Sequence, residues 1–407
     1  MTAYSRREWL IVLVLSLGTF IGVLNVYLLT PFLGLVARQF GVSEAAVGLL
    51  STVYSLVGAV VGLLAAPLMD RYQRKRLLQF GLVVVGVGVA LSAVAPSYTV
   101  LLPARALAGF GSAFLFSCAY AAASDVFPDA NRRNRCIGIL YSATGIGAVL
   151  GIPVLTQLAA AFGWRWAVVS LLVPIAALTA GANLLPRLAL DARRAGMLAD
   201  YLGRYRQVLG HTEVSLLLTV SLLRNVVWTV PLIYSVAIWN GLFHLSLRGF
   251  GWVFSVGGVV YFVASNLAPA VLRRVSPLRA FVAASVVQLA AGLGFGLTTG
   301  SLTGALIVFC GGIAGSGPVA IVALNVLLQD VLPEYRGAVL SLSGTMGEAG
   351  SALGGIVGGL ILVTLGAIAL VPLTSVLIPA SVLVCWLSVR RPVRVAQPAE
   401  RAEPVTA

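Results

Sequence analysis

The sequence predicts an all-α membrane protein with twelve transmembrane helices in two pseudo-symmetric six-helix bundles. The mean hydropathy is +0.99 and only 10% of the residues are charged, whereas a soluble domain carries about 25% charged residues. Apolar runs of about 20 residues, the length that crosses a bilayer, recur along the whole chain. The two halves of the chain also repeat one another. These three observations together favour two packed bundles of membrane helices.

Each expected helix follows from one apolar run. In the first bundle the helices are expected at about 9–37, 45–69, 77–95, 98–127, 136–161 and 166–185. In the second they are expected at about 214–243, 247–272, 278–298, 302–330, 338–365 and 367–387. We therefore expect an N-terminal bundle over 1–186, a cytoplasmic linker over 187–213 with or without a surface helix, a C-terminal bundle over 214–389, and a polar, disordered cytoplasmic tail over 390–407.

The internal repeat appears in two pairs of segments. SDVFPD at 124–129 returns as QDVLPE at 329–334, and GAVLG at 147–151 returns as GSALG at 350–354. Two six-helix halves joined by a linker are an established plan of secondary transporters, in which the substrate site lies between the halves near the middle of the bilayer. The repeat therefore predicts a binding site between the bundles.

The net charge of +14 is explained by loops rather than by nucleic-acid binding. Of the 27 basic residues, only Arg38, Arg165 and Arg248 fall in loops of the external side, and Arg105 and Arg224 fall inside spans. Basic residues collect in cytoplasmic loops. We therefore expect a protein of the bacterial inner membrane with both termini on the cytoplasmic side. The first apolar run is too long for a cleavable signal peptide. The four cysteines have no metal-ligand or redox spacing, so we expect no metal, cofactor or disulfide.

The loop APLMDRYQRKRLL, 66–78, places Asp70 directly before a basic cluster. It could serve only to orient two helices, or it could latch the cytoplasmic side, with Asp125 and Arg135 completing the charge network. The stretch resembles the loop between helices 2 and 3 of the major facilitator superfamily, G-x-L-x-D-R-x-G-R-[KR]-x-x-L, with Ala66 and Gln73 in place of the two glycines. The resemblance implies a cytoplasmic gate formed by Asp70, Arg71, Arg74, Lys75, Asp125 and Arg135.

Arg105 lies inside the fourth expected helix. An arginine there costs about 2.5–3.5 kcal/mol on insertion scales, so it should face protein or water. Arg105 with Gly109 resembles the helix 4 motif of the same superfamily. Two interpretations stay open: an arginine capped by backbone carbonyls, and one that tunes proton transfer or substrate charge.

GIGAVLGIP, 145–153, resembles the glycine-rich helix 5 motif of drug-exporting members. Because isoleucine separates the glycine from the proline and FGWR follows at 162–165, the variant looks closer to sugar-efflux-like and multidrug members. Small residues four apart let helices approach closely, and close packing is a simpler explanation than substrate contact. The expected packing residues are Gly147, Gly151, Pro153, Gly350 and Gly354.

Glu348 is a carboxylate deep inside the eleventh expected helix, and Arg224 is a guanidinium midway along the seventh. A static pair between them would fix the C-terminal bundle. Alternatively, Glu348 carries the coupling proton. Helix 1 offers Asn25 and Tyr27 but no carboxylate, which departs from many drug–proton antiporters. The further polar candidates, each also explained by packing, are Tyr120, Asn225, Trp228, Tyr234, Asn240, Asn266, Gln288 and Asn325.

The expected function is secondary transport of a small organic solute by alternating access, as a monomer in the lipid bilayer. The resemblance to the drug/sugar-efflux branch, the 12-helix drug:proton antiporters, implies a proton-coupled exporter. An uncoupled or differently coupled carrier of a neutral or anionic metabolite stays open as the alternative. A channel or a membrane-embedded enzyme is less favoured, and no Walker motif indicates ATP-driven transport.

Overall fold

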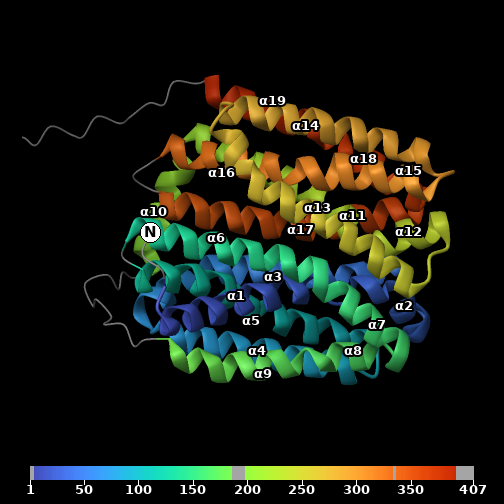
Figure 1. Cartoon of the computed structure of the whole chain (residues 1–407), viewed down its shortest axis with the longest axis horizontal. Coiled ribbons are helices and arrows are strands. Elements are labelled where there is room, and N and C mark those ends of the chain that lie inside the picture. Colours follow the sequence, from blue (N-terminus) through green and yellow to red (C-terminus); the bar gives the residue numbers. More distant parts are fainter. Residues whose placement is uncertain (1–3, 128, 186–197, 333–335, 391–407) are drawn as a thin grey trace, which may run out of the picture.

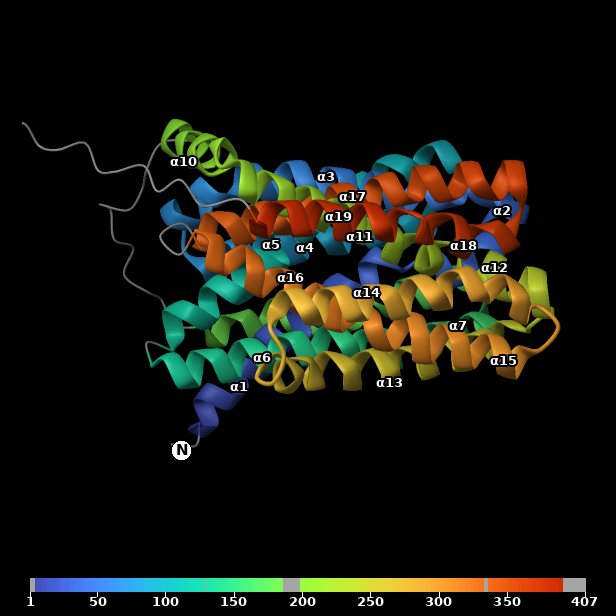
Figure 2. The ribbon, with the colours of Figure 1, turned by 90° about the horizontal axis from the view of Figure 1, so that it is seen from above.

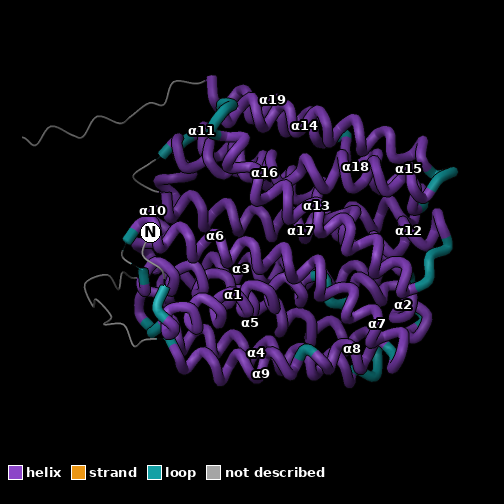
Figure 3. The backbone as a smooth tube through the Cα atoms, in the orientation of Figure 1, coloured by secondary structure: helices purple, strands orange, loops and turns teal. Residues whose placement is uncertain are grey.

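The computed structural model describes residues 4–127, 129–185, 198–332 and 336–390, and these residues form helices joined by short turns (Figure 3). Within them, eleven helical runs are long and apolar enough to cross a membrane. The fifth expected helix is also present, although only its Val149–Phe162 part is apolar by the same measure. The predicted all-α membrane fold is therefore confirmed.

The N-terminal half holds the first six expected spans. Its elements are α1 (Arg6–Val26), η1 (Thr30–Phe32), α2 (Leu33–Phe40), α3 (Glu44–Arg71), α4 (Arg74–Val94), α5 (Tyr98–Val126), α6 (Ala130–Ile146), the π-helical η2 (Gly147–Gly151), α7 (Ile152–Phe162), α8 (Trp164–Ser170), α9 (Leu172–Gly181) and η3 (Ala182–Leu184). The helix α10 (Leu198–Gly210) follows in the linker.

The C-terminal half holds the other six. Its elements are α11 (Thr212–Ile233), α12 (Ser235–Phe243), α13 (Leu247–Leu272), α14 (Pro277–Gly294), η5 (Phe295–Thr298), α15 (Leu302–Leu306), the π-helical η6 (Ile307–Ala314), α16 (Gly315–Val331), α17 (Arg336–Leu365), η8 (Ala367–Ala369), α18 (Leu370–Ser375) and α19 (Leu377–Arg390).

The first expected helix of each half is broken, where the sequence predicted unbroken helices over 9–37 and 214–243. Tyr27 ends α1 with φ −98° and ψ 16°, and Tyr234 ends α11 with φ −97° and ψ 18°. A proline stands near each break, Pro31 in η1 and Pro231 in α11. Pro31 has no backbone N–H to donate to the Tyr27 carbonyl four residues earlier, which explains the first interruption, whereas Pro231 lies inside α11 three residues before the second. The two tyrosines occupy corresponding places in the two halves.

Two loops are shorter than the sequence indicated. Only Tyr72 and Gln73 separate α3 from α4, so most of the basic loop is helical. The basic segment expected as a loop at 128–135 is helical from Ala130 onward, because the Asp129 side chain accepts a hydrogen bond from the backbone N–H of Arg132 at 2.9 Å. Such an acceptor satisfies one of the free N–H groups at a helix start.

The FGWR segment forms the tight corner between α7 and α8. Gly163 has φ +89°, a backbone conformation that side chains disfavour. Arg165 then donates to the carbonyl oxygens of Ala93 and Ala95, at 2.6 and 2.8 Å. Its guanidinium thus caps the carbonyl end of α4, as expected for cations at a helix C-terminus. The motif is explained by this structural role.

The two halves lie side by side, with the helices of the N-terminal half (blue to green) below those of the C-terminal half (yellow to red) in Figure 1. The beginning of α1, the linker helix α10 and the end of α19 lie at one end of the bundle, which we call the linker side (Figures 1 and 2). The other end, with α2, α12 and α15, is called the opposite side.

Tyr234 joins the halves on the opposite side. Its ring is fully buried, and its hydroxyl donates to the Gly355 carbonyl of α17 at 2.6 Å. A Cβ added to Gly48 of α3 would stand 2.2 Å from this hydroxyl oxygen. Beside it, Thr52 of α3 donates to the Ala352 carbonyl at 3.3 Å. The sequence named Tyr234 as a candidate for the substrate cavity; in the structure its ring packs against Gly48 of α3 and Gly358 of α17.

The substitution Gly48→Ala should disturb closure on the opposite side, because its methyl group would overlap the Tyr234 hydroxyl. The test is modification of a cysteine placed at Leu232 by an impermeant maleimide added from the opposite side. Labelling should be several-fold faster in Gly48→Ala than in the parent. Gly62→Ala is the matched control, since nothing lies within 4 Å of a Cβ there. Equal labelling in all three proteins would contradict a closing role for Tyr234.

Candidate functional site

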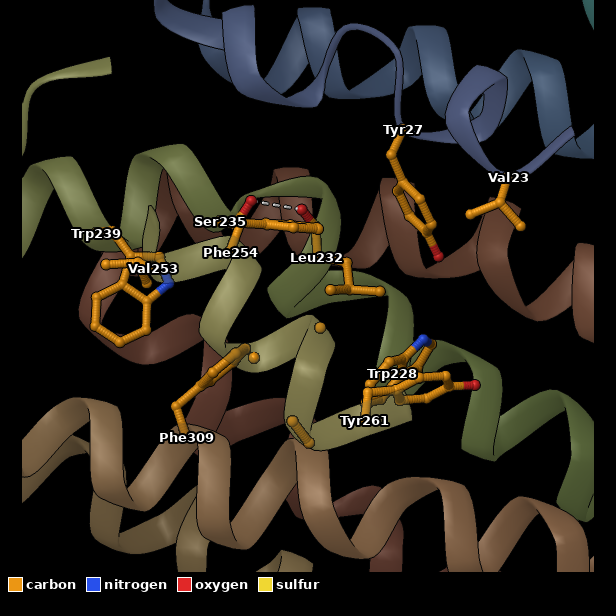
Figure 4. Close-up of a pocket in the computed structure, with 13 residues that line it drawn as sticks. Val23, Tyr27, Trp228, Leu232, Ser235, Trp239, Val253, Phe254, Tyr261 and Phe309 are labelled. Carbon is orange, nitrogen blue, oxygen red and sulfur yellow. Dashed lines mark hydrogen bonds between the residues drawn. The ribbon is translucent and has the colours of Figure 1, made fainter. Parts of the chain in front are cut away.

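A cavity of about 150 Å³ lies where α1 meets the C-terminal half. Roughly ten water-sized volumes fit such a space, enough for a small organic molecule. Tyr27 and Val23 reach it from α1, while α11, α12, α13 and η6 supply the other walls (Figure 4). Six of its thirteen lining residues are aromatic and none is charged: Tyr27, Trp228, Trp239, Phe254, Tyr261 and Phe309.

The aromatic walls are packed against one another. The rings of Trp228 and Tyr261 have centroids 4.9 Å apart, and the edge of Trp239 meets Phe309 at 5.5 Å (Figure 4). The Trp228 indole also lies near the Tyr27 hydroxyl. A wall of this kind offers faces for stacking and a few polar groups for orientation. It suits a flat, uncharged or weakly polar molecule.

The wall has a signature in the sequence that our reasoning missed. Phe254, Gly257, Gly258 and Tyr261 follow helical spacing along one face of α13. Gly258 admits the neighbouring segment η2, since a Cβ there would lie 2.9 Å from a side-chain methyl of Val149, and Gly257 faces Phe309 of η6. An aromatic and glycine stripe on an apolar helix is therefore the signal that could have located the cavity.

Arg105 and Asn25 form a buried unit in the N-terminal half, and neither side chain is exposed. The Arg105 guanidinium donates to the Asn25 side-chain oxygen at 2.9 Å and to the Asn25 carbonyl at 2.6 Å. It also lies over the Tyr54 ring, 4.6 Å from the centroid. The arginine is thus held by a carbonyl, an amide and a ring, without a carboxylate partner among the described side chains.

Glu348 faces α3 and not Arg224. Ser55 lies close to its carboxyl group, and Tyr27 and Tyr54 are close enough to interact with it electrostatically. Its side chain is partly exposed. Within the described part of the chain, Glu348 takes part in no ion pair. The carboxyl group of the C-terminal half therefore meets uncharged hydroxyl groups of the N-terminal half.

Arg224 donates to the amide oxygen of Gln288 on α14 and lies 5.8 Å from the centre of the Phe281 ring. The static Glu348–Arg224 pair that the sequence left open is not formed. Both residues lie near the middle of their helices, but they point to different neighbours. Sequence position could not decide this, because a helix carries its side chains all round its axis.

Only some of the charged residues expected to form a gate contact one another. Arg74 pairs with Asp125 at 3.1 Å, which joins α4 to α5 on the linker side. Lys75 donates to the Asn183 carbonyl at 3.4 Å. Arg135 does not join them: it lies over the rings of Tyr4 and Trp9, at 5.3 and 5.8 Å. Aromatic faces attract the exposed guanidinium there. The side chains of Asp70 and Arg71 lie outside the described part of the structure.

Asn225 and Asn325 are not among the residues that line the cavity. Asn225 donates to the Ser221 carbonyl at 2.9 Å and packs against Gly347 of α17. The Asn325 carbonyl accepts from Gln329 within α16. The Tyr120 side chain lies outside the described part.

The glycines expected at helix contacts lie close to neighbouring chain segments. A Cβ on Gly151 would stand 2.1 Å from Leu24, and one on Gly350 would stand 2.4 Å from the Leu222 carbonyl. Gly147 faces Phe20, Pro153 faces Gly251, and Gly354 faces Val226 and Thr229. These contacts are of the close-packing kind.

Comparison with known proteins identifies the family. A model of the Major Facilitator Superfamily matches residues 15–355. The chain belongs to the major facilitator superfamily. The resemblance read from the loop and helix motifs is thereby confirmed, and this superfamily member is a multi-pass membrane transporter and not an enzyme.

Two relatives and one solved structure illustrate the similarity. The chain is 32% identical over 161 residues to the multidrug resistance protein Stp of Mycobacterium tuberculosis (strain CDC 1551 / Oshkosh), which covers 40% of this chain and only 30% of Stp. It is 28% identical over 346 residues to a chloramphenicol efflux pump of the same strain, covering 84% of this chain and 80% of the pump. The crystal structure of a D-xylose–proton symporter superposes with a TM-score of 0.76 at 16% identity, over 95% of this chain and 98% of the symporter, which supports the fold alone.

The Asn25 side chain should be needed to hold Arg105. Asn25→Ala removes one of two acceptors of a buried guanidinium, so the free energy of unfolding should fall by about 1.5–3 kcal/mol. Asn25→Asp keeps an acceptor and should stay near the parent. Thermal unfolding of purified protein in detergent measures both, with Asn240→Ala, an exposed residue of α12, as the control. An unchanged melting temperature in Asn25→Ala would mean that the backbone carbonyl alone suffices.

Proposed function

We propose that this transporter exports small, uncharged aromatic compounds and that Glu348 carries the coupling proton. The observation that carries the proposal is the cavity between α1 and the C-terminal half, with an aromatic lining that bears no charge. A charged drug would lack a counter-ion in that wall, whereas a neutral ring can stack on Trp228 or Tyr261. The printed names of the relatives, a chloramphenicol efflux pump and a multidrug resistance protein, support export of such compounds.

Glu348 is the proposed proton carrier because it faces groups that can accommodate the neutral form. Ser55 and Tyr54 on α3 and Tyr27 at the end of α1 offer hydroxyl groups and no cation. An ionised carboxylate is costly to bury without a partner, so it needs water, which one arrangement of the halves would admit. Because Glu348 belongs to α17 and its neighbours to the other half, its surroundings change when the halves move.

The proposed cycle is alternating access in the inner membrane with the linker side in the cytoplasm. Thr52 of α3 donates to the Ala352 carbonyl of α17, and the Tyr234 ring packs against Gly48 of α3, so the halves meet on the opposite side. Opening that side separates α3 from α17 and carries Glu348 away from Ser55. Release of the aromatic compound on the opposite side and protonation of Glu348 there would allow the return step. The basic residues of the linker-side loops support this orientation.

The cavity predicts a binding role for Trp228. Trp228→Ala removes an indole ring on which a bound aromatic compound could stack. The Kd for chloramphenicol should rise about 2- to 12-fold, the equivalent of about 0.5–1.5 kcal/mol for an aromatic contact. Isothermal calorimetry on purified protein measures this. Trp252→Ala is the matched control, because that indole is 67% exposed on α13. If both variants and the parent bind chloramphenicol with equal affinity, the cavity is not its binding site.

The proton role is tested with Glu348→Gln, which resembles the protonated residue. In proteoliposomes the variant should keep chloramphenicol exchange without a pH gradient but lose gradient-driven accumulation. Glu213→Gln, at the first turn of α11, should keep both. Gradient-driven accumulation at the parental rate in Glu348→Gln would show that another group carries the proton, and loss of exchange as well would assign Glu348 to substrate binding.

A further inference from the structure

We infer that the C-terminal half holds a binding site for a monovalent anion at Arg224, Ser285 and Gln288. The side chains are almost fully buried, with 3%, 0% and 1% of their surface exposed. Arg224 projects from α11, and Ser285 and Gln288 project from α14. The three residues are not among those that line the aromatic cavity.

The first argument is that Arg224 has free donors. One of its terminal nitrogens donates to Gln288, but Nε and Nη1 have no acceptor within the described part of the chain. Ion pairs between described side chains do not include Arg224 either. A buried guanidinium with two unused N–H groups and no negative partner is strongly disfavoured in a membrane interior.

The second argument is that a further unpartnered group lies beside it. Phe281, Ser285 and Gln288 are spaced four and three residues apart on α14, so they share one helix face. Arg224 contacts both ends of this stripe, the Phe281 ring and the Gln288 amide. Ser285 stands between them, and its hydroxyl has no partner among the described residues. The helix spacing puts Ser285 on the side of α14 that Arg224 contacts, and guanidinium N–H and serine O–H groups on one side are donors for an anion.

The comparison with Arg105 shows what the Arg224 environment lacks. Arg105 donates to two oxygen atoms of Asn25, one of them a backbone carbonyl, and lies over a tyrosine ring. Arg224 has a single amide acceptor and a more distant phenylalanine ring. Arg105 is left with one unpartnered nitrogen, Nε, whereas Arg224 is left with two, Nε and Nη1.

Glu348 cannot supply the missing charge by a movement of the halves. Ser221 contacts Ser343 at 3.1 Å and Thr229 contacts Ser351 at 3.0 Å, so α11 and α17 are joined within one half. Ser221 and Thr229 lie on the same face of α11 as Asn225. Arg224 points in a direction about 100° away from Asn225 around the helix axis. Relative movement of two rigid halves leaves Glu348 and Arg224 as they are. The anion must come from outside this half.

Two sources have the required chemistry: a free anion such as chloride, and the carboxylate of an aromatic solute in the adjoining cavity, which would extend the proposed substrates beyond uncharged compounds. The second is within reach because a Cβ on Gly317 would lie 3.2 Å from the Trp228 ring and 3.6 Å from the Gln288 amide nitrogen. The aromatic cavity and the Arg224 site therefore adjoin across Gly317. Sodium benzoate is the probe for the carboxylate source, and sodium chloride for the free anion.

The test is thermal unfolding of the purified full-length protein in detergent at constant ionic strength, with sodium gluconate replaced stepwise by sodium chloride or sodium benzoate. The melting temperature of the parent should be about 2–5 °C higher in the salt of the anion that binds than in sodium gluconate. Ser285→Ala should raise the half-saturating concentration about 2- to 12-fold, the equivalent of one hydrogen bond. Arg224→Gln should abolish the response, and Arg105→Gln should keep it.

A response to chloride would assign a free anion, and a response to benzoate alone would assign a solute carboxylate. No response of the parent to either anion would overturn the inference, as would an equal response in the parent, Ser285→Ala and Arg224→Gln. If Arg224→Gln does not fold, the shift in Ser285→Ala decides the outcome. Since no transport is measured, the result stands apart from the chloramphenicol and proton experiments.

Discussion

Charged groups inside a bilayer must find partners within the protein, and this requirement orders the centre of the molecule. Arg105 takes a backbone carbonyl and an amide from Asn25, so it ties α5 to α1. Arg224 takes Gln288 and ties α11 to α14. Glu348 alone among the central charges faces the other half, at Ser55. The two arginines stiffen their own halves, and the carboxyl group lies where the halves separate.

The pseudo-symmetry of the halves extends to the two helix-ending tyrosines, but their tasks differ. Tyr27 leaves α1 and meets Trp228 of the other half in the aromatic cavity. Tyr234 leaves α11 and fits against Gly48 of the other half, with its hydroxyl on Gly355. A proline-associated break in each half thus sends one ring across the interface. The Tyr27 ring helps to form the cavity, and the Tyr234 ring packs between the halves on the opposite side.

Glycine determines where the halves can touch. Gly258 admits Val149, and Gly355 admits Thr52, whose hydroxyl oxygen would stand 2.0 Å from a Cβ there. Both π-helical segments, η2 and η6, lie beside these contacts or line the cavity. π-helical turns often mark functional places because their extra residue disturbs regular packing. One π-helical segment, η6, therefore forms part of the cavity wall, and the other, η2, packs against the α13 wall at Gly258.

The sequence by itself determined the membrane class, the positions of the spans, the repeat and the superfamily. These features are local: apolar length, loop charge and short motifs carry them along the chain. It also singled out Arg105, Arg224 and Glu348, because any charge inside an apolar run is conspicuous. Their partners were decided only by tertiary structure. Lipid and protein interior are both apolar, so hydropathy does not show which face of a helix such as α11 turns inward. For that reason Tyr234 was assigned to a cavity, Arg135 to a gate, and Tyr261 and Phe309 to nothing, until packing fixed the rotation of each helix.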